Sequence, residues 1–183
     1  EARAWLVIAS EKLKAKDQLF GPKNAYVLPL MKLAAKVAFA EKNYVAGVDA
    51  LISGLNYRGQ KDDEAVSMLF EIWGTARQEK QWDQARQILQ RMKENQLPEA
   101  EYQTTFAVLE TEAGDWKAAA GAVVLAEKLT LSEEQKKNLA SAVAKIPADV
   151  LKKAREEYAA KNPVKPAPPA TNNVGGGGFG WWF

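Results

Sequence analysis

The chain of 183 residues contains no cysteine and no histidine. This absence excludes disulfides, thiolate nucleophiles, imidazole bases, Ser-His-Asp triads and the usual zinc sites, because each of them needs one of these residues. The chain also lacks a large excess of charge of either sign, since 25 Lys and Arg nearly balance 23 Asp and Glu. The resulting net charge of +2 gives no strong field for nucleic acid. No apolar run of about eighteen residues occurs, so no bilayer-spanning helix is predicted.

The remaining reactive groups do not form a convincing catalytic set. Three acidic pairs lie at predicted helix starts or on a solvated face, where helix-dipole pairing and solubility explain them: Asp62-Asp63, Glu133-Glu134 and Glu156-Glu157. Gly175, Gly177 and Gly180 match the spacing of a dinucleotide-binding loop but lack its preceding strand and following helix. We therefore expect no enzyme activity, no catalytic residues, no metal site and no cofactor.

Composition divides the chain near residue 161. Strong helix formers with apolar residues every three or four positions fill the chain up to that point, which predicts an all-α domain over residues 1–161. Proline recurs between Pro163 and Pro169, and four glycines follow at 175–178, so residues 162–183 are predicted to be a flexible linker with an aromatic end. The chain begins with Glu1, which predicts a processed form or an excised segment.

Three short phrases recur within the helical region. Each has a polar turn, an aromatic residue and then a small residue three positions later: Lys42-Asn43-Tyr44-Val45-Ala46-Gly47, Lys80-Gln81-Trp82-Asp83-Gln84-Ala85 and Gly114-Asp115-Trp116-Lys117-Ala118-Ala119. Trp82 and Trp116 lie 34 residues apart, while Tyr44 and Trp82 are separated by the same period plus four residues. In these features the chain resembles the tetratricopeptide repeat (TPR) family over about residues 24–161. The resemblance implies a right-handed α-solenoid of three to four helical hairpins.

Two antiparallel helices that cross closely need small residues at the contact. In three successive hairpins these positions are taken by Ala35 and Gly47, by Trp73 and Ala85, and by Ala107 and Ala119. Trp73 is too large for such a crossing. We expect either that Gly74 takes the contact or that the second hairpin is splayed.

A fourth, weaker unit is predicted after the third hairpin. Its first helix would run from Ser132 to Ile146 and begin with a capping box, and its second would carry Leu151, Ala154 and Tyr158. Lysine, arginine and glutamate dominate that last helix, as a terminal repeat requires. At the other end, a helical stripe of Ala2, Trp5, Ala9 and Leu13 predicts a helix that packs on unit one.

Two surfaces are predicted to bind partners. The first helices of such a solenoid line its concave face, where an extended peptide or an amphipathic helix would bind. By alignment, the lining comprises Lys32, Lys36, Phe39, Phe70, Arg77, Gln78, Thr104, Val108 and Thr111.

The aromatic end of the chain is the second candidate, as a tethered docking motif of Phe179, Trp181, Trp182 and Phe183. Its receptor is left open between a partner protein, another copy of the chain and the chain's own groove.

These features favour a non-catalytic scaffold or adaptor that binds a protein partner. The alternative is a structural subunit of a bacterial envelope or secretion assembly, whose aromatic end anchors it to a neighbouring subunit or to the membrane interface. Self-association through the tail is compatible with both. Nucleic acid is not an expected partner, because lysines such as Lys136 and Lys152 have acids nearby. A bacterial periplasm or cell envelope is favoured over the cytoplasm.

Overall fold

The computed structural model describes residues 8, 11–12, 27–58 and 62–163, and within these ranges every regular element is helical. The all-α prediction is confirmed for this part of the chain. The predicted stripe of Ala2, Trp5, Ala9 and Leu13 and the aromatic motif at 179–183 lie outside the described residues. Eight helices are described over these ranges: α2 (Val27–Ala40), α3 (Tyr44–Arg58), α4 (Asp63–Gln78), α5 (Trp82–Glu94), α6 (Glu99–Ala113), α7 (Trp116–Ala126), α8 (Glu133–Val143) and α9 (Ala148–Lys161).

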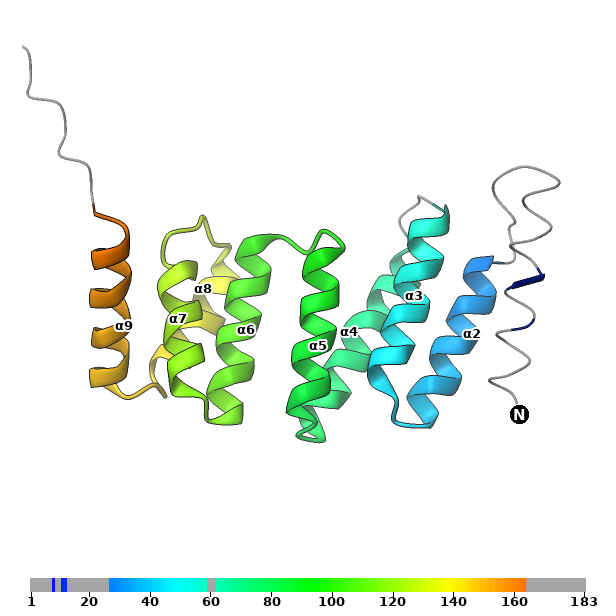
Figure 1. Ribbon diagram of the computed structural model, residues 1–183, viewed down its shortest axis with the longest axis horizontal. Helices are drawn as coiled ribbons and strands as arrows, with labels where there is room; N and C mark the ends of the chain where they lie inside the picture. Colours follow the sequence, from blue (N-terminus) through cyan, green and yellow to red (C-terminus); the bar gives the residue numbers. More distant parts are fainter. Residues whose placement is uncertain (1–7, 9–10, 13–26, 59–61, 164–183) are drawn as a thin grey trace, which may run out of the picture.

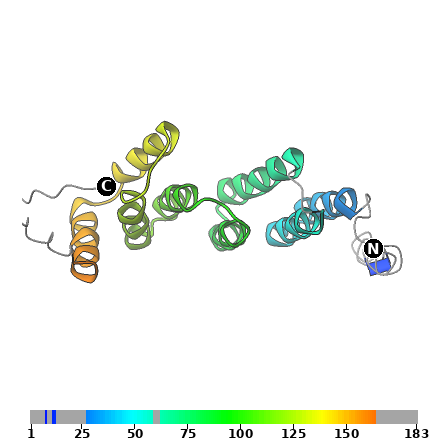
Figure 2. The ribbon, with the colours of Figure 1, turned by 90° about the horizontal axis from the view of Figure 1, so that it is seen from above.

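The helices stand side by side in a long row (Figure 1). The substantial contacts all join helices that are one or two places apart in the chain. Seen from above, α4, α6 and α8 lie along one side of the row and α3, α5, α7 and α9 along the other (Figure 2). The core is therefore assembled from neighbours in sequence rather than closed around one centre.

The three recurring phrases share one turn geometry. Lys42, Lys80 and Gly114 all have a positive φ, of 57°, 59° and 82°, which places each in the left-handed region. The residue after each one donates its backbone N–H to a carbonyl five residues earlier, as in a Schellman helix end: Asn43 to Ala38, Gln81 to Ala76 and Asp115 to Glu110. The next residue starts a helix in all three cases, at Tyr44, Trp82 and Trp116. The phrases aligned by sequence are thus equivalent in structure.

The first and third hairpins cross closely at the predicted small residues. Ala35, Ala107 and Ala119 have no exposed surface. A Cβ added at Gly47 would lie 3.4 Å from the carbonyl oxygen of Ala35, and one at Gly54 only 2.9 Å from the Cβ of Met31. Larger side chains at these glycines would force α2 and α3 apart.

The second hairpin is splayed. A Cβ added at Gly74 would meet nothing within 4 Å, so Gly74 does not take the close contact. Trp73 is buried instead, with the Arg77 guanidinium 5.0 Å from its ring centroid and its indole N–H without an acceptor. Both views show α4 steeply inclined to α5 (Figures 1 and 2). The bulk of Trp73 explains this inclination, since it stands where the other hairpins carry alanine.

Two apolar clusters form the core, one mainly from α2 to α5 and the other from α6 to α9. The second helices of the three hairpins each bury an apolar residue at the same place, namely Leu51, Leu89 and Val123. The aromatic residues that start these helices differ in burial, since Tyr44 is buried and Trp116 is 38% exposed.

The fourth unit contains the two predicted helices, α8 and α9. Ser132 accepts a hydrogen bond from the backbone N–H of Gln135, whose side chain accepts one from the backbone N–H of Ser132. The predicted capping box is thus confirmed. Leu151 is buried on α9, whereas Lys152, Lys153 and most of the other charged side chains of that helix are exposed.

An ion pair joins the tight turns of the first two hairpins. The Lys42 ammonium and the Tyr44 hydroxyl donate to the Glu79 carboxylate at 2.9 and 2.8 Å. These two donors, Lys42 first, hold the pKa of Glu79 below its usual value. The turns are further linked because the backbone N–H of Tyr44 donates to the side-chain oxygen of Gln84 at 3.0 Å.

We expect Glu79→Gln to be less stable than the wild type at neutral pH. The folded state lowers the pKa of Glu79. Its contribution to the free energy of unfolding is therefore present above the ordinary glutamate pKa and is lost as pH falls through the lowered pKa. The difference in free energy of unfolding between the wild type and Glu79→Gln should therefore shrink in acid. Urea unfolding at a series of pH values measures it. Glu71→Gln, which changes an exposed carboxylate on α4, is the control and should show no such convergence.

Two glycine substitutions should have opposite effects. Gly54→Ala is expected to lower the free energy of unfolding by about 1–3 kcal/mol, because the new Cβ collides with Met31 and the helices must separate. Gly74→Ala should raise it by up to about 1 kcal/mol, since the methyl group enters open space and alanine favours the helix. Chemical denaturation of both variants tests the pair. Equal effects of one sign would contradict the close crossing of α2 and α3.

Candidate partner-binding groove

An open groove of about 760 Å³ lies where α3 ends, α4 begins and α5 leads into α6. We call it the central groove. The lining residues come from these three segments: Ile52, Leu55 and Asn56; Val66, Leu69 and Phe70; and Met92, Glu94, Asn95, Gln96, Leu97 and Pro98. It is thus built by residues from two successive hairpins.

The inclination of α4 accounts for the groove. A tight turn at residues 79–81 joins the end of α4 to the start of α5. Away from this turn the two helices diverge, so the first half of α4 and the last turn of α5 face each other across open space (Figures 1 and 2). Because Trp73 lies in the middle of α4, its bulk sets the divergence that opens the groove.

The groove has an apolar surface. Ile52, Leu69 and Met92 are buried beneath it, while Val66 and Phe70 on α4 are 36% and 39% exposed. Such exposed apolar side chains beside a concave, mostly apolar wall are typical of surfaces that bind another apolar group. The chemistry offered is therefore hydrophobic burial rather than ionic recognition.

The polar groups on the rim are largely paired. The side-chain amide of Asn56 donates to the amide oxygen of Asn95 at 2.8 Å, and Asn95 donates to the Arg91 carbonyl at 2.8 Å. Gln96 has a φ of 76° and forms the exposed corner between α5 and α6. Among the described residues that line the groove, Glu94 alone is charged. The rim thus adds amide groups but little net charge.

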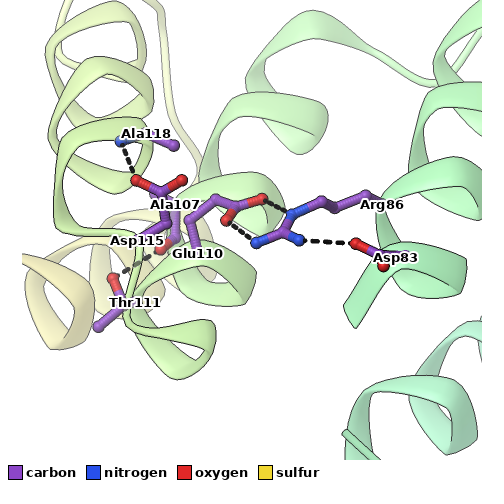
Figure 3. Close-up of polar contacts among 7 residues, drawn as sticks. All are labelled: Asp83, Arg86, Ala107, Glu110, Thr111, Asp115 and Ala118. Carbon is purple, nitrogen blue, oxygen red and sulfur yellow. Dashed lines mark hydrogen bonds and ion pairs between the residues drawn. The ribbon is translucent and has the colours of Figure 1, made fainter. Parts of the chain in front are cut away.

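Polar contacts hold the α5–α6 wall of the groove in place. The Arg86 guanidinium donates two hydrogen bonds of 2.7 Å to the Glu110 carboxylate and a third to Asp83 (Figure 3). Glu110 is only 1% exposed, and its pairing raises the pKa of Arg86 above the usual value. Nearer the groove, the Lys93 ammonium lies 4.1 Å from the Tyr102 ring centroid. These contacts fix α6 against α5 and therefore fix the segment that carries Leu97 and Pro98.

Of the predicted concave lining, Phe70 is the one residue that lies in the central groove. On α2, Lys32 pairs with Asp62 and Glu64 at 2.8 and 2.7 Å, which raises the pKa of its ammonium. Lys32 thereby links the first hairpin to the second. Lys36 is exposed and Phe39 packs on the Tyr44 ring. None of these three α2 residues lines the central groove beside Phe70.

The remaining predicted lining residues divide by exposure. Arg77 pairs with Glu112 at 3.2 Å, and Gln78 is exposed. Thr104 and Thr111 are buried, and their hydroxyls donate to backbone carbonyls one turn earlier on α6. The prediction that they line an open surface is wrong, because the register places them on the packed face of α6. Val108 is half-buried against the second apolar cluster.

Sequence reasoning missed most of the groove. Ile52 and Leu55 lie on a second helix, and only first helices had been considered as lining. Leu97 and Pro98 form a connection between hairpins that the repeat pattern treats as a spacer. The signal that pointed to this region was Trp73, whose size predicted a splayed hairpin without showing which surface the splay would open.

Neither metal binding nor membrane spanning is supported in the described ranges. No group of three or more Asp and Glu side chains there has the spacing to hold a metal ion. No helix in those ranges is both long and apolar enough to cross a bilayer.

Comparison with protein-family models, curated proteins and solved structures finds no match to this chain.

We expect the two halves of the Arg86–Glu110 pair to differ when removed. Arg86→Met leaves the Glu110 carboxylate buried without its guanidinium partner and should lower the free energy of unfolding by about 3–5 kcal/mol. Glu110→Met should cost clearly less, because Arg86 is 35% exposed and its charge can turn toward water. Urea unfolding of both variants measures the difference. A greater loss for Glu110→Met would contradict the assigned burial.

Proposed function

We propose that this chain is a non-catalytic interaction scaffold, a TPR-like right-handed α-solenoid that binds an apolar segment of a protein partner in the central groove. The observation that carries the proposal is the groove itself, where Val66 and Phe70 stand exposed beside a buried apolar floor. Apolar surface exposed to water does not stabilise a monomer, whereas an apolar side chain of a partner would bury this surface and gain free energy.

The arrangement of the helices supports a scaffold role. Hairpins with one shared turn geometry, each packed on its neighbours, resemble repeat proteins whose surfaces bind extended ligands. Ion pairs bridge successive hairpins, as between Lys32 and Asp62 or between Arg77 and Glu112. They stiffen the row, and a stiff surface loses less entropy when it binds.

The chemistry of the groove defines the partner. An apolar floor with amides on the rim fits a short amphipathic helix or an extended peptide that presents one or two large apolar side chains. A strongly acidic or basic peptide would gain little, because Glu94 is the single charged side chain among the lining residues that the structure describes. The partner segment is thus expected to be apolar on one face and near neutral.

Selection from a displayed library of random peptides tests the proposal. Peptides enriched on the wild-type chain should carry clustered apolar or aromatic residues. They should bind Phe70→Asp at least about ten times more weakly, which corresponds to about 1.4 kcal/mol. Phe70 is 39% exposed, so the substitution should leave the helix content unchanged, and circular dichroism verifies this.

Leu33→Asp provides the matched control. Leu33 is an exposed leucine on α2, 51% accessible, and does not line the central groove. The selected peptides should bind this variant as they bind the wild type. Enrichment of no peptide, or equal loss of binding in both variants, would contradict the assignment of the groove as the partner site.

A further inference from the structure

A second groove lies at the far end of the row, between α7 and α9. Its volume is about 590 Å³, and we call it the terminal groove. The lining residues are Lys117, Gly121, Val124, Leu125, Asp149, Val150, Lys153, Ala154, Glu157, Tyr158 and Lys161. Leu125 is 41% exposed there, and Val150 and Tyr158 are half-buried. Like the central groove, it leaves apolar surface uncovered.

The chain itself carries a segment suited to cover this surface. Residues 164–183 follow directly after α9, whose last residue, Lys161, already lines the groove. They include four aromatic residues within 179–183 but a single charged one, Lys165. We propose that the aromatic segment 179–183 binds in the terminal groove of the same molecule.

The length of the connecting segment permits this. About 15 residues separate Pro163 from Phe179, and at about 3.3 Å per residue they span up to about 50 Å. The groove follows α9 from Asp149 to Lys161, and 14 helical residues extend about 21 Å. The chain can therefore turn back at the end of α9 and still reach every part of the groove. A tether of this length also raises the local concentration of the segment to about the millimolar range.

Lysines in the lining of the terminal groove favour tryptophan. Lys117, Lys153 and Lys161 line the groove together with the acids Asp149 and Glu157, and a lysine ammonium over an indole face gains cation–π attraction. A lysine already lies over an aromatic ring at this groove, where the Lys128 ammonium is 5.9 Å from the Tyr158 ring centroid. The central groove offers no lysine or arginine among its described lining residues. It is also separated from α9 by α6 and α7 (Figure 1). The terminal groove is thus both nearer and chemically better matched.

The absence of cysteine allows a direct test. A nitroxide label is attached to one introduced cysteine, at Lys152→Cys beside the terminal groove or at Ser67→Cys beside the central groove; both positions are exposed and outside the lining. The indole N–H signals of Trp181 and Trp182, assigned by Trp→Phe substitution, are then followed by NMR in the full chain. We expect the label at position 152 to broaden both signals and the label at position 67 to leave them sharp.

Leu125→Glu should abolish the broadening, because it places a charge on the apolar floor. Leu33→Glu, on a leucine of α2 that is 51% exposed against 41% for Leu125, should not change it. Both variants are checked for helix content, and both leucines are exposed enough for folding to survive.

Three outcomes would overturn the proposal. Broadening by the label at position 67 would place the segment in the central groove. Sharp signals with both labels would show that the segment binds in neither groove. A mixed sample, with isotope on one copy and nitroxide on another, identifies binding to a second copy if it shows the same broadening. The first of these results would also place the segment against Val66 and Phe70, whereas the other two leave peptide binding there untouched. The proposed function is tested separately, by peptide binding to Phe70→Asp and Leu33→Asp, so the two proposals can fail separately.

Discussion

The distance at which two helices of a hairpin can cross is the constraint on which the rest of the structure depends. Alanine and glycine at the crossing let α2 approach α3 and let α6 approach α7, so the buried faces of these pairs close completely. Trp73 occupies the corresponding place in the second hairpin and prevents the same approach. The resulting inclination of α4 opens the central groove. One large side chain thus converts a packed interface into an accessible surface.

The polar contacts between hairpins complement this packing. Each apolar cluster is built from helices close in sequence, and the two clusters meet on α6, where Phe106 packs against both. On the same helix the buried Glu110 carboxylate accepts two hydrogen bonds from the Arg86 guanidinium of α5. Such a pair adds little net stability but strongly disfavours arrangements in which either charge is left alone. It therefore fixes the relative position of the two halves, and with it the wall of the central groove.

The two grooves have different chemistry, and this difference separates their roles. The central groove is apolar with an amide rim, which suits a partner segment supplied from outside. The terminal groove is apolar, has three lysines and two acids in its lining, and extends to Lys161, the last residue of α9. A repeat array needs its last unit shielded from water, because no further hairpin covers it. The proposed return of the aromatic segment would supply that shield without another repeat.

The sequence alone determined the helical class, the three equivalent turns, the capping box and the misfit of Trp73. These features are local, because a left-handed turn residue, a cap or a small residue acts within a few positions of the chain. Only the tertiary structure decided which side chains share a surface. Thr104 and Thr111 proved buried, and Leu97 and Pro98 proved to line a groove, because the inclination of α4 and the rotation of α6 depend on contacts between hairpins. Periodicity gives the face of a helix to within about one residue, but it does not give the angle between two helices.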